Sequence, residues 1–307
     1  MMSAVILVVG EALVDLVIDP AGNVTAALGG APFNTARACG RLGADVAFAG
    51  AISVDRFGSM LAARLDADGV STAFVPRCDA PTTLAAAELD ERGTATYRFY
   101  FEGTSAPSLT SLPGSPSPSV VFTGGLGLVL EPMAATAEAL VAAGADAGAA
   151  VMVDVNCRPR IIPDREPYVA RVERVLRRAH VVKVSDEDLA YLYEGEAPLD
   201  AARAVLALGP RVVLLTAGGG SVHVLTAGGE ADVPVPKVDV VDTIGAGDSF
   251  GGGFLAWWQA SGRPAADLAS LDAVVPAVRA AIAVAGVVVT RRGADPPWRH
   301  ELPADWS

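Results

Sequence analysis

Short, continuous apolar runs recur along the chain and limit the folds that are open to it. Six of them read as buried strands, at residues 5–9, 46–49, 120–123, 150–153, 181–184 and 211–215. Strands that are apolar along their whole length are typical of parallel sheets covered on both faces. Ala-rich amphipathic stretches lie between the runs, at 34–42, 133–143 and 168–178. This alternation predicts an α/β fold with a doubly wound, mainly parallel central sheet.

Two regions interrupt this rhythm and predict a smaller sheet beside the main one. Residues 13–27 read as two short strands around the turn Asp19-Pro20-Ala21-Gly22. Residues 82–103 read as a hairpin that turns at Glu91-Arg92-Gly93. Since neither region has a helix between its strands, we expect a small antiparallel sheet that acts as a lid. The 307 residues then form a single domain, 1–307, with this lid as an appendage.

Charge and cysteine content exclude several classes of partner. The formal net charge is −12, so the surface repels phosphate backbones and anionic lipid, and we expect neither nucleic acid nor a membrane as partner. The three cysteines form no C-x-x-C pair, which favours a reducing cytoplasm over a disulfide framework. The three histidines are scattered, so a zinc site is not expected. No apolar run reaches the ~20 residues that span a bilayer.

Residues 242–253, DTIGAGDSFGGG, carry the pattern of an anion site. Gly245, Ala246 and Gly247 allow a tight loop whose backbone N–H groups point one way, and a helix N-terminus follows. Fixed donors of this kind stabilise the charge on a transferring phosphoryl group. Asp248 lies in the first helical turn, where a carboxylate can take a proton from an attacking hydroxyl. The alternative is a Gly-rich strand–helix turn in which Asp248 only caps the helix.

A second glycine motif, GGAPFN, lies at residues 29–34. Its two glycines let the backbone approach a ligand closely, and Asn34 offers a donor and an acceptor to a polyol. Asp15 lies just past the first strand, at the end where open α/β sheets bind their ligands. A carboxylate there can accept two hydroxyl hydrogen bonds. Asn34 as a plain helix N-cap is the competing interpretation.

The two motifs together resemble those of the ribokinase-like (PfkB) family of carbohydrate and nucleoside kinases, and the resemblance covers nearly the whole chain. It implies an αβα sandwich with a β-sheet lid, ATP and Mg²⁺ as cosubstrates, and often a stimulating K⁺. The family's catalytic base and anion hole match Asp248 and residues 245–247. Its sugar-binding positions match Asp15, Gly30 and Asn34.

The resemblance also points to residues that would hold the nucleotide. In the segment LTAGGGS, Thr216 and Gly218 match the family's T-x-G motif, and Lys183 and Gly247 are further nucleotide-binding candidates. Residues 281–294 resemble the stretch that flanks adenine and the monovalent cation.

Two acidic residues are the candidates for metal ions. Asp242 is the candidate ligand of the monovalent cation. The family often shows N-x-x-E near Mg²⁺, where this chain has Ser185 in place of the Asn and Asp188 at the acidic position. We therefore expect Asp188 to hold Mg²⁺ through water, with this contact departing from the usual pattern.

Residues 154–158, DVNCR, bear on the choice of substrate. They resemble the D-x-N-x-R segment of fructokinases and of ketodeoxygluconate kinases. Arg158 would bind a substrate carboxylate, a phosphate or ATP. The alternative is a surface arginine that pairs with Asp154.

The predicted lid strand narrows the choice of substrate further. Its aromatic residues 97, 99 and 101 alternate with Arg98 and Tyr100, and we take Tyr100 as the substrate-binding candidate. Acid-sugar kinases of the family tend to carry an arginine just after the paired aromatics, where this chain has Glu102. Because a glutamate repels a carboxylate, the sequence favours a neutral ketohexose such as fructose over 2-keto-3-deoxygluconate.

The expected function is ATP-dependent phosphorylation of a sugar hydroxyl, of the fructokinase kind. A nucleoside remains an alternative substrate, and the lid aromatics also allow a homodimer that pairs through the lid. A non-catalytic sugar or nucleotide sensor is an alternative of another class. Such a sensor would be expected to have lost the base or the anion hole, and both are present in the sequence.

Overall fold

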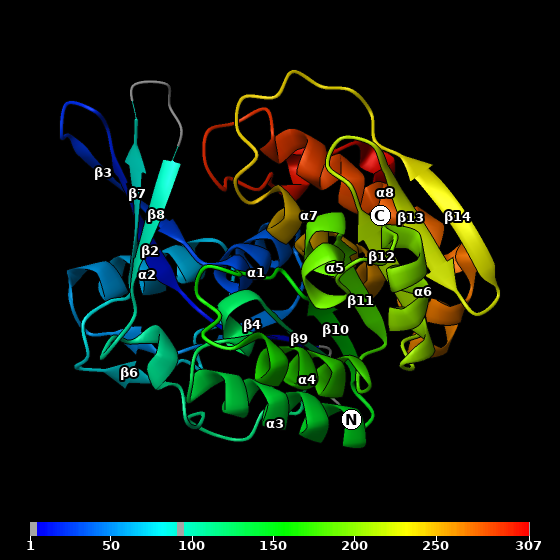
Figure 1. Ribbon diagram of the computed structural model, residues 1–307, viewed down its shortest axis with the longest axis horizontal. Helices are drawn as coiled ribbons and strands as arrows, with labels where there is room; N and C mark the ends of the chain where they lie inside the picture. The colour runs from blue at the N-terminus through cyan, green and yellow to red at the C-terminus, as the bar shows by residue number, and fades with distance from the viewer. Residues whose placement is uncertain (1–4, 91–94, 307) are drawn as a thin grey trace.

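An eight-stranded sheet forms the centre of the computed structural model, which describes residues 5–90 and 95–306 (Figure 1). Its strands lie in the order β14-β13-β12-β11-β10-β9-β1-β4. Neighbours from β12 to β4 pair in parallel, and β13 and β14 add an antiparallel hairpin at one edge. The strands are β1 (Ile6–Val9), β4 (Val46–Ala49), β9 (Val120–Gly124), β10 (Ala150–Asp154), β11 (Val181–Ser185), β12 (Val212–Thr216), β13 (Ser221–Thr226) and β14 (Gly229–Pro234). Every predicted buried run is one of the parallel strands, so the mainly parallel sheet is confirmed.

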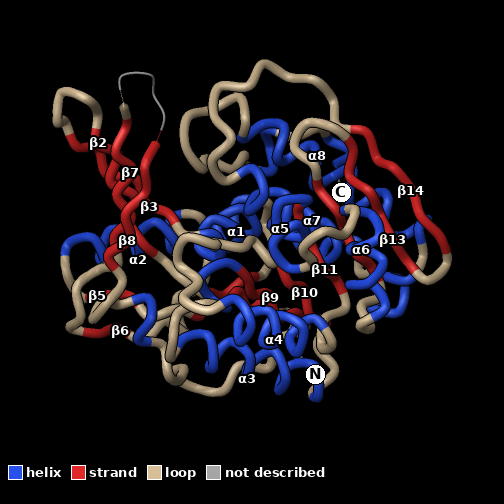
Figure 2. The backbone as a smooth tube through the Cα atoms, viewed as in Figure 1, coloured by secondary structure: helices blue, strands red, loops and turns tan. Residues whose placement is uncertain are grey.

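Helices cover both faces of this sheet and complete an αβα sandwich (Figure 2). One layer consists of α1 (Ala31–Arg41), α2 (Arg56–Ala67), α7 (Ala246–Ser261) and α8 (Leu271–Val288). The other consists of α3 (Met133–Asp146), α4 (Arg165–Leu176), α5 (Asp186–Leu192) and α6 (Pro198–Ala207). Successive strand residues point to opposite faces, so Ile6 and Val8 pack in one core and Leu7 and Val9 in the other. Short 3₁₀ helices lie in the connections and in the C-terminal segment: η1 (Ala106–Ser108), η2 (Gly125–Leu128), η3 (Ala265–Ala269), η4 (Arg299–Glu301) and η5 (Ala304–Trp306).

A second, four-stranded sheet stands beside the sandwich, at the upper left of Figure 1. Its order is β3 (Val24–Gly29), β2 (Leu13–Ile18), β7 (Leu84–Leu89) and β8 (Ala95–Tyr100). These are the four strands that the sequence predicts, although the expected turn at 91–93 lies outside the described residues. The sheet is not wholly antiparallel as expected, because β2 pairs with β7 in parallel. The chain crosses the sandwich between these two strands and re-enters the sheet in the same direction, through a small sheet of β5 (Ile52–Ser53) and β6 (Arg77–Cys78).

The C-terminal third departs from the sequence reading at two points. The strand-like region 231–241 ends as a strand at Pro234, and residues 235–244 form a loop. Pro234 and Pro236 lack the N–H that a strand ladder needs, which is a physical reason for the strand to end there.

Helix α8 is long and apolar enough to cross a membrane by length and composition alone. Here it packs against α7 and contributes Val274, Val278 and Ala281 to the core.

Candidate active site

The two glycine motifs meet where the N-termini of α1 and α7 lie side by side. Asn34 Nδ2 donates to Asp248 Oδ2 at 2.9 Å, and the Thr35 hydroxyl donates to the Asp248 backbone oxygen at 3.1 Å. The Asn34 side-chain oxygen is buried without a hydrogen-bond partner among the described residues. Such atoms are rare, so this oxygen is a ready acceptor for a ligand hydroxyl. Asn34 is not a helix N-cap, since Gly30 holds that position in α1.

The turn before α7 has the backbone shape of an anion site. Gly245, the N-cap residue of α7, has a φ of 76°, in the left-handed region that favours glycine. A Cβ at this position would also lie 2.5 Å from Ala294 Cβ, so a side chain does not fit. The α7 dipole adds positive potential to the turn. The Ala246 N–H, expected in the anion hole, donates instead to the Thr243 oxygen at 3.2 Å, so Ala246 shapes the turn and offers no free amide.

A buried ion pair lies directly beside this turn. Lys183 Nζ lies 2.9 and 3.0 Å from the two Asp154 oxygens, and both side chains are almost fully buried. Burial opposes the charged form of Lys183, but the Asp154 carboxylate outweighs it and raises the pKa of the lysine. A Cβ on Gly247 would lie 3.2 Å from Lys183 Nζ, so the ammonium lies against the glycine turn. Asp154 thus pairs with Lys183, and the alternative in which it pairs with Arg158 does not hold.

Asp248 and Asp15 are carboxylates whose environment favours the proton. Burial raises the pKa of Asp248 to about 6; the Asn34 hydrogen bond opposes the rise, and the charge on Asp154 adds to it. Burial also raises the pKa of Asp15 to about 6, against the pull of the Arg158 charge. Perturbed carboxylates that gather in one place are typical of functional sites.

Asp15 lies over the second glycine motif. A Cβ on Gly29 would lie 2.3 Å from Asp15 Oδ2, and a Cβ on Gly30 would lie 2.6 Å from the Glu11 backbone oxygen. The chain therefore needs both glycines to bring Asp15 and the start of α1 together. These contacts support the reading of Asp15, Gly30 and Asn34 as one polyol-binding surface.

The lid register corrects the expectation for Tyr100. Asp15 is paired with Ala85, and Ala85 with Phe99, so these three side chains share one face of the sheet. Tyr100 is paired with Leu84 and points to the other face, where it is 55% exposed. Within this chain, Tyr100 does not line the site with Asp15. The alternation in the sequence was read correctly, but Tyr100 lies on the lid face opposite Asp15.

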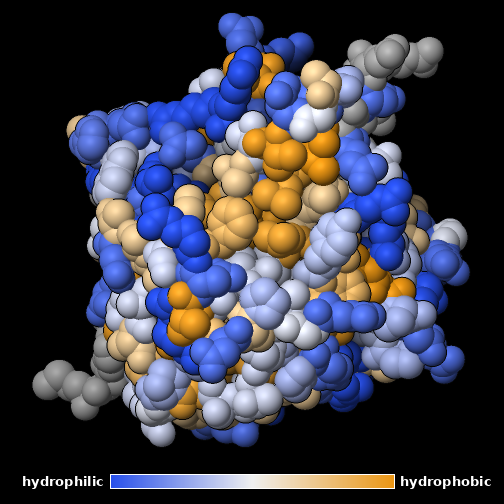
Figure 3. Space-filling view, turned by 90° about the vertical axis from the view of Figure 1, so that its left-hand side faces the viewer, coloured by the Kyte–Doolittle hydropathy of each residue, from blue (hydrophilic) through white to orange (hydrophobic). Residues whose placement is uncertain are grey.

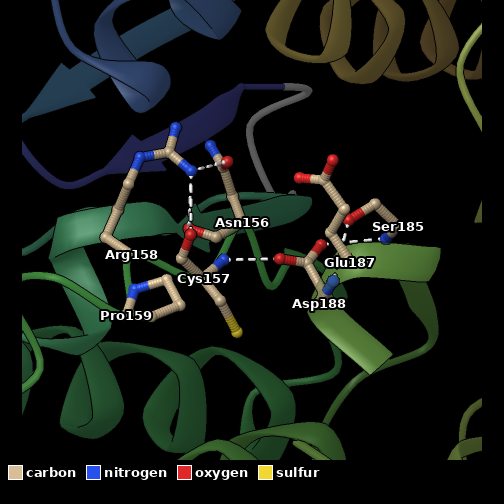
Figure 4. Close-up of a pocket in the computed structure, with 7 residues that line it drawn as sticks. All are labelled: Asn156, Cys157, Arg158, Pro159, Ser185, Glu187 and Asp188. Carbon is tan, nitrogen blue, oxygen red and sulfur yellow. Dashed lines mark hydrogen bonds between the residues drawn. The ribbon is translucent and has the colours of Figure 1, made fainter. Parts of the chain in front are cut away.

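Arg158 stands at the rim of a small pocket of about 130 Å³ (Figure 4). Its guanidinium donates to the backbone oxygens of Asn156 and Cys157 and to the Asn156 side chain. Asn156 has a φ of 43°, a left-handed conformation that non-glycine residues adopt uncommonly. The Arg158 side chain is exposed, and its charge lowers the pKa values of Glu11, Asp15 and Asp248. Arg158 is therefore the exposed positive charge beside the acidic side chains of Glu11, Asp15 and Asp248.

Asp188 lines the same pocket, but its oxygens already have partners. Its Oδ1 accepts from the Cys157 N–H at 2.6 Å, and its Oδ2 accepts from the Ser185 N–H at 2.8 Å. The Ser185 hydroxyl in turn accepts from the Asp188 N–H, which completes a capping box for α5. Ser185 therefore replaces the family's Asn as a helix cap, and Asp188 fixes the 156–158 loop. The neighbouring Glu187 is exposed and lines the pocket as well.

The other nucleotide and cation candidates lie at the same edge of the sheet. Thr216 ends β12 in register with Ser185, and Gly218 follows in a turn with a φ of 55°. Asp242 connects two loops, since its Oδ1 accepts from the Ile244 N–H and its Oδ2 from the Gly293 N–H. The described residues contain no group of three or more His, Cys, Asp or Glu side chains arranged to hold a metal ion.

Glu11 is a buried carboxylate at this site that sequence reasoning missed. It is 2% exposed and accepts from the N–H groups of Ala31 and Gly127, both at 3.1 Å. It therefore ties the end of β1 to the start of α1 and to η2. Burial raises its pKa to about 7. The available signal was its position, an acid directly after a fully apolar strand end.

Comparison with known proteins agrees with this geometry. The family model described as pfkB family carbohydrate kinase matches residues 3–301. The chain is 38% identical over 264 residues to a fructokinase of Rhizobium leguminosarum bv. trifolii, covering 82% of this chain and 78% of that protein. A crystal structure of fructokinase with bound ATP from Xylella fastidiosa has a TM-score of 0.88 at 30% identity and covers 98% of this chain and 95% of that one.

A fructokinase double mutant from Vibrio cholerae O395, in a form that binds fructose, ADP and potassium ion, is also similar. Its TM-score is 0.83 at 26% identity, over 95% of this chain and 94% of that one. These likenesses confirm the ribokinase-like αβα architecture that the resemblance implied. Since the family model spans nearly the whole length, the chain belongs to the pfkB family of carbohydrate kinases.

Proposed function

We propose that this protein transfers the γ-phosphoryl group of ATP to a hydroxyl of fructose or a closely related ketohexose. One observation carries the proposal. Asp248 lies in the first turn of α7, hydrogen-bonded to Asn34 and next to the glycine turn beside Lys183. This arrangement supports Asp248 as the proton acceptor, Asn34 as a polyol-binding amide and the neighbouring glycine turn as an anion site.

Each group has a role that its surroundings support. Asp15, Gly30 and the unpartnered Asn34 oxygen would bind sugar hydroxyls. Asp248 would accept the proton of the attacking hydroxyl, and its raised pKa makes it a better base than an exposed aspartate. The amides of Gly245 and Gly247, with the helix dipole, would stabilise charge on the phosphoryl oxygens.

The nucleotide would lie along the edge formed by Lys183, Thr216 and Gly218. Bound Mg²⁺ would neutralise charge on the phosphates. Asp188, whose main role is to fix the 156–158 loop, would also hold this Mg²⁺ through water. Glu187 lies beside Asp188 in the same pocket. Asp242 and the loop at Gly293 would hold a monovalent cation, as the K⁺-bound relative suggests.

The charges around the site favour a neutral sugar. Three carboxylates lie near the site, namely Glu11, Asp15 and Asp248. Arg158 is the exposed positive group near them. Glu102 is exposed just past β8, where an acid-binding member would carry an arginine. An anionic substrate such as 2-keto-3-deoxygluconate would meet net repulsion here. A non-catalytic sensor is disfavoured too, because the base and the glycine turn are both in place.

We further propose that the protein is a homodimer that pairs through the outer lid face. We define this face as the side of the lid sheet opposite Asp15, with Leu16, Ala26, Leu28, Leu84 and Tyr100. Figure 3 shows it as an apolar surface between polar borders. Apolar patches of this kind mark interaction sites.

The described cysteines are free, so we place the protein in a reducing cytoplasm.

A coupled assay of ADP release tests the function. The panel is fructose, tagatose, ribose, 2-keto-3-deoxygluconate and adenosine, with Asp248→Asn as the matched variant. We expect the highest kcat/KM for fructose, and a kcat about 10²–10⁴-fold lower in the variant because the general base is lost. The KM for fructose should change little. Preference for the acid sugar, turnover of none of the five, or a fully active Asp248→Asn would contradict the proposal.

A further inference from the structure

Two arginines one turn apart on α1 are almost fully buried and share one carboxylate. Arg37 Nε lies 2.6 Å from one oxygen of Asp68, and Arg41 Nε lies 2.8 Å from the other. Asp68, the C-cap residue of α2, is 1% exposed. A guanidinium does not lose its proton in proteins, and burying it is unfavourable unless it is paired and hydrogen-bonded. Two such groups on one helix face therefore call for a structural reason.

The remaining donors of both arginines reach the segment that follows α8. Arg37 Nη1 donates to the Ala294 backbone oxygen at 2.8 Å. Arg41 Nη1 donates to the Pro296 backbone oxygen at 2.6 Å and to Asp295 Oδ1 at 2.7 Å. The pair thus fastens residues 294–296 to α1.

Ala294 is also the residue against which the glycine turn packs. A Cβ on Gly245 would lie 2.5 Å from Ala294 Cβ and 2.9 Å from its Cα, so the two backbones are in close contact. The neighbouring Gly293 N–H donates to Asp242 Oδ2 at 2.8 Å, which attaches the same segment to the start of the turn. The turn therefore rests on a segment whose position Arg37 determines.

Helix α1 consequently holds the phosphate-binding region at two points. Asn34 contacts Asp248 directly, on the α7 side of the turn. One helical turn later, Arg37 holds Ala294, behind Gly245. Both points belong to one rigid element, so the base and the turn keep a fixed spacing.

We propose that Arg37, oriented by Asp68, is a positioning residue that sets the phosphate-binding turn at Gly245 through the Ala294 carbonyl. This inference rests on the proposed kinase function. Arg37 acts only through Ala294, in contrast to the residues that would touch ATP. Arg41 supplies a natural control, because it shares Asp68 and the same burial but binds residues 295 and 296, whereas the three atoms nearest to a Cβ on Gly245 all belong to Ala294.

The test compares Arg37→Lys with Arg41→Lys in the full-length protein. Each lysine keeps the charge that pairs with Asp68 but cannot bond Asp68 and the distant carbonyl together in the arginine's fork geometry. Binding of a non-hydrolysable ATP analogue and of fructose is measured separately by calorimetry, and KM values for ATP and fructose by the coupled assay. We expect Arg37→Lys to weaken binding of the analogue and raise the KM for ATP by about tenfold or more, because small displacements at a reacting centre have large effects. Its fructose affinity should stay within about twofold of wild type.

The same measurements on Arg41→Lys separate positioning from stability. We expect a similar fall in Tm for both variants, and nucleotide binding within about twofold of wild type for Arg41→Lys. Wild-type affinity for the ATP analogue in folded Arg37→Lys, or an equal loss in both variants, would overturn the inference. Failure of the wild-type protein to bind the ATP analogue would instead refute the proposed function on which the inference rests.

Discussion

Glu11, Asp15 and Asp248 converge on one small site, and burial raises the pKa of each. For a base this shift is useful, since Asp248 is still ionised at neutral pH yet binds a proton more readily than an exposed aspartate. For Glu11 the consequence is one of stability, because it is the most buried of the three and contacts two backbone N–H groups.

We predict that Glu11→Gln changes the pH dependence of stability. The glutamate pKa rises from 4.5 when unfolded to about 7 when folded, so the folded state holds the extra proton between these values. The stabilisation that this bound proton gives the folded state is complete below pH 4.5 and is lost as the pH rises through 7. Relative to Glu11→Gln, the wild-type free energy of unfolding should therefore fall by about 3 kcal/mol over this range.

Denaturant unfolding from pH 4.5 to 8 measures this difference. The exposed Glu102→Gln is the control for the removal of a surface carboxylate. A constant offset between wild type and Glu11→Gln at every pH would show that Glu11 stays ionised throughout.

At the scale of elements, the contact between α1 and α7 sets the site. Gly252 of α7 lies against α1, and its close neighbours there include the α1 backbone. A Cβ on Gly252 would lie 2.5 Å from Ala38 Cβ and 2.8 Å from the Thr35 oxygen. Gly251 differs, since the nearest atom to its Cβ would be 3.7 Å away.

We predict that Gly252→Ala separates α7 from α1 and disrupts the Asn34–Asp248 hydrogen bond. Overpacking at such a contact destabilises by about 1–3 kcal/mol. Because Asp248 and Asn34, the proposed base and sugar-binding residue, sit on the two helices, kcat should fall about tenfold or more. Gly251→Ala, one residue away, should be neutral or more stable by up to about 1 kcal/mol, since alanine favours a helix.

Thermal unfolding and the coupled assay on both variants check this prediction. If Gly252→Ala matched Gly251→Ala in stability and in kcat, the helix contact would have no part in aligning the site.

At the scale of the whole molecule, the outer lid face is the surface that bears on assembly. Val24 and Tyr100 on this face are 58% and 55% exposed, although both are large and apolar or aromatic. The opposite lid face carries Asp15 and would close over the sugar. A partner on the outer face would therefore hold the lid sheet without blocking the site.

We predict that Ala26→Glu converts the proposed dimer to a monomer. Ala26 lies midway along the edge strand β3, on the outer lid face and opposite Leu16, so a glutamate there would bury an unpaired charge in the proposed interface. Light scattering coupled to gel filtration measures the mass. Val240→Glu, an exposed apolar position outside the lid, is the control and should leave the mass unchanged. A wild-type protein that is already monomeric would refute the dimer.

The apolar runs and the two glycine motifs determined much of this protein from sequence alone. A buried strand must be apolar along its length, and a tight turn beside a helix N-terminus must have glycine, so the parallel sheet, the lid strands and Asp248 could all be read locally. Strand order, cross-strand register and side-chain pairing depend on residues far apart in the chain, and only the tertiary structure decided them. That is why Tyr100 lies on the unexpected lid face, Asp154 pairs with Lys183, and Asp188 caps a helix. Glu11 and Arg37 belong to the same class, because a buried charge shows its purpose only through the partners that folding brings to it.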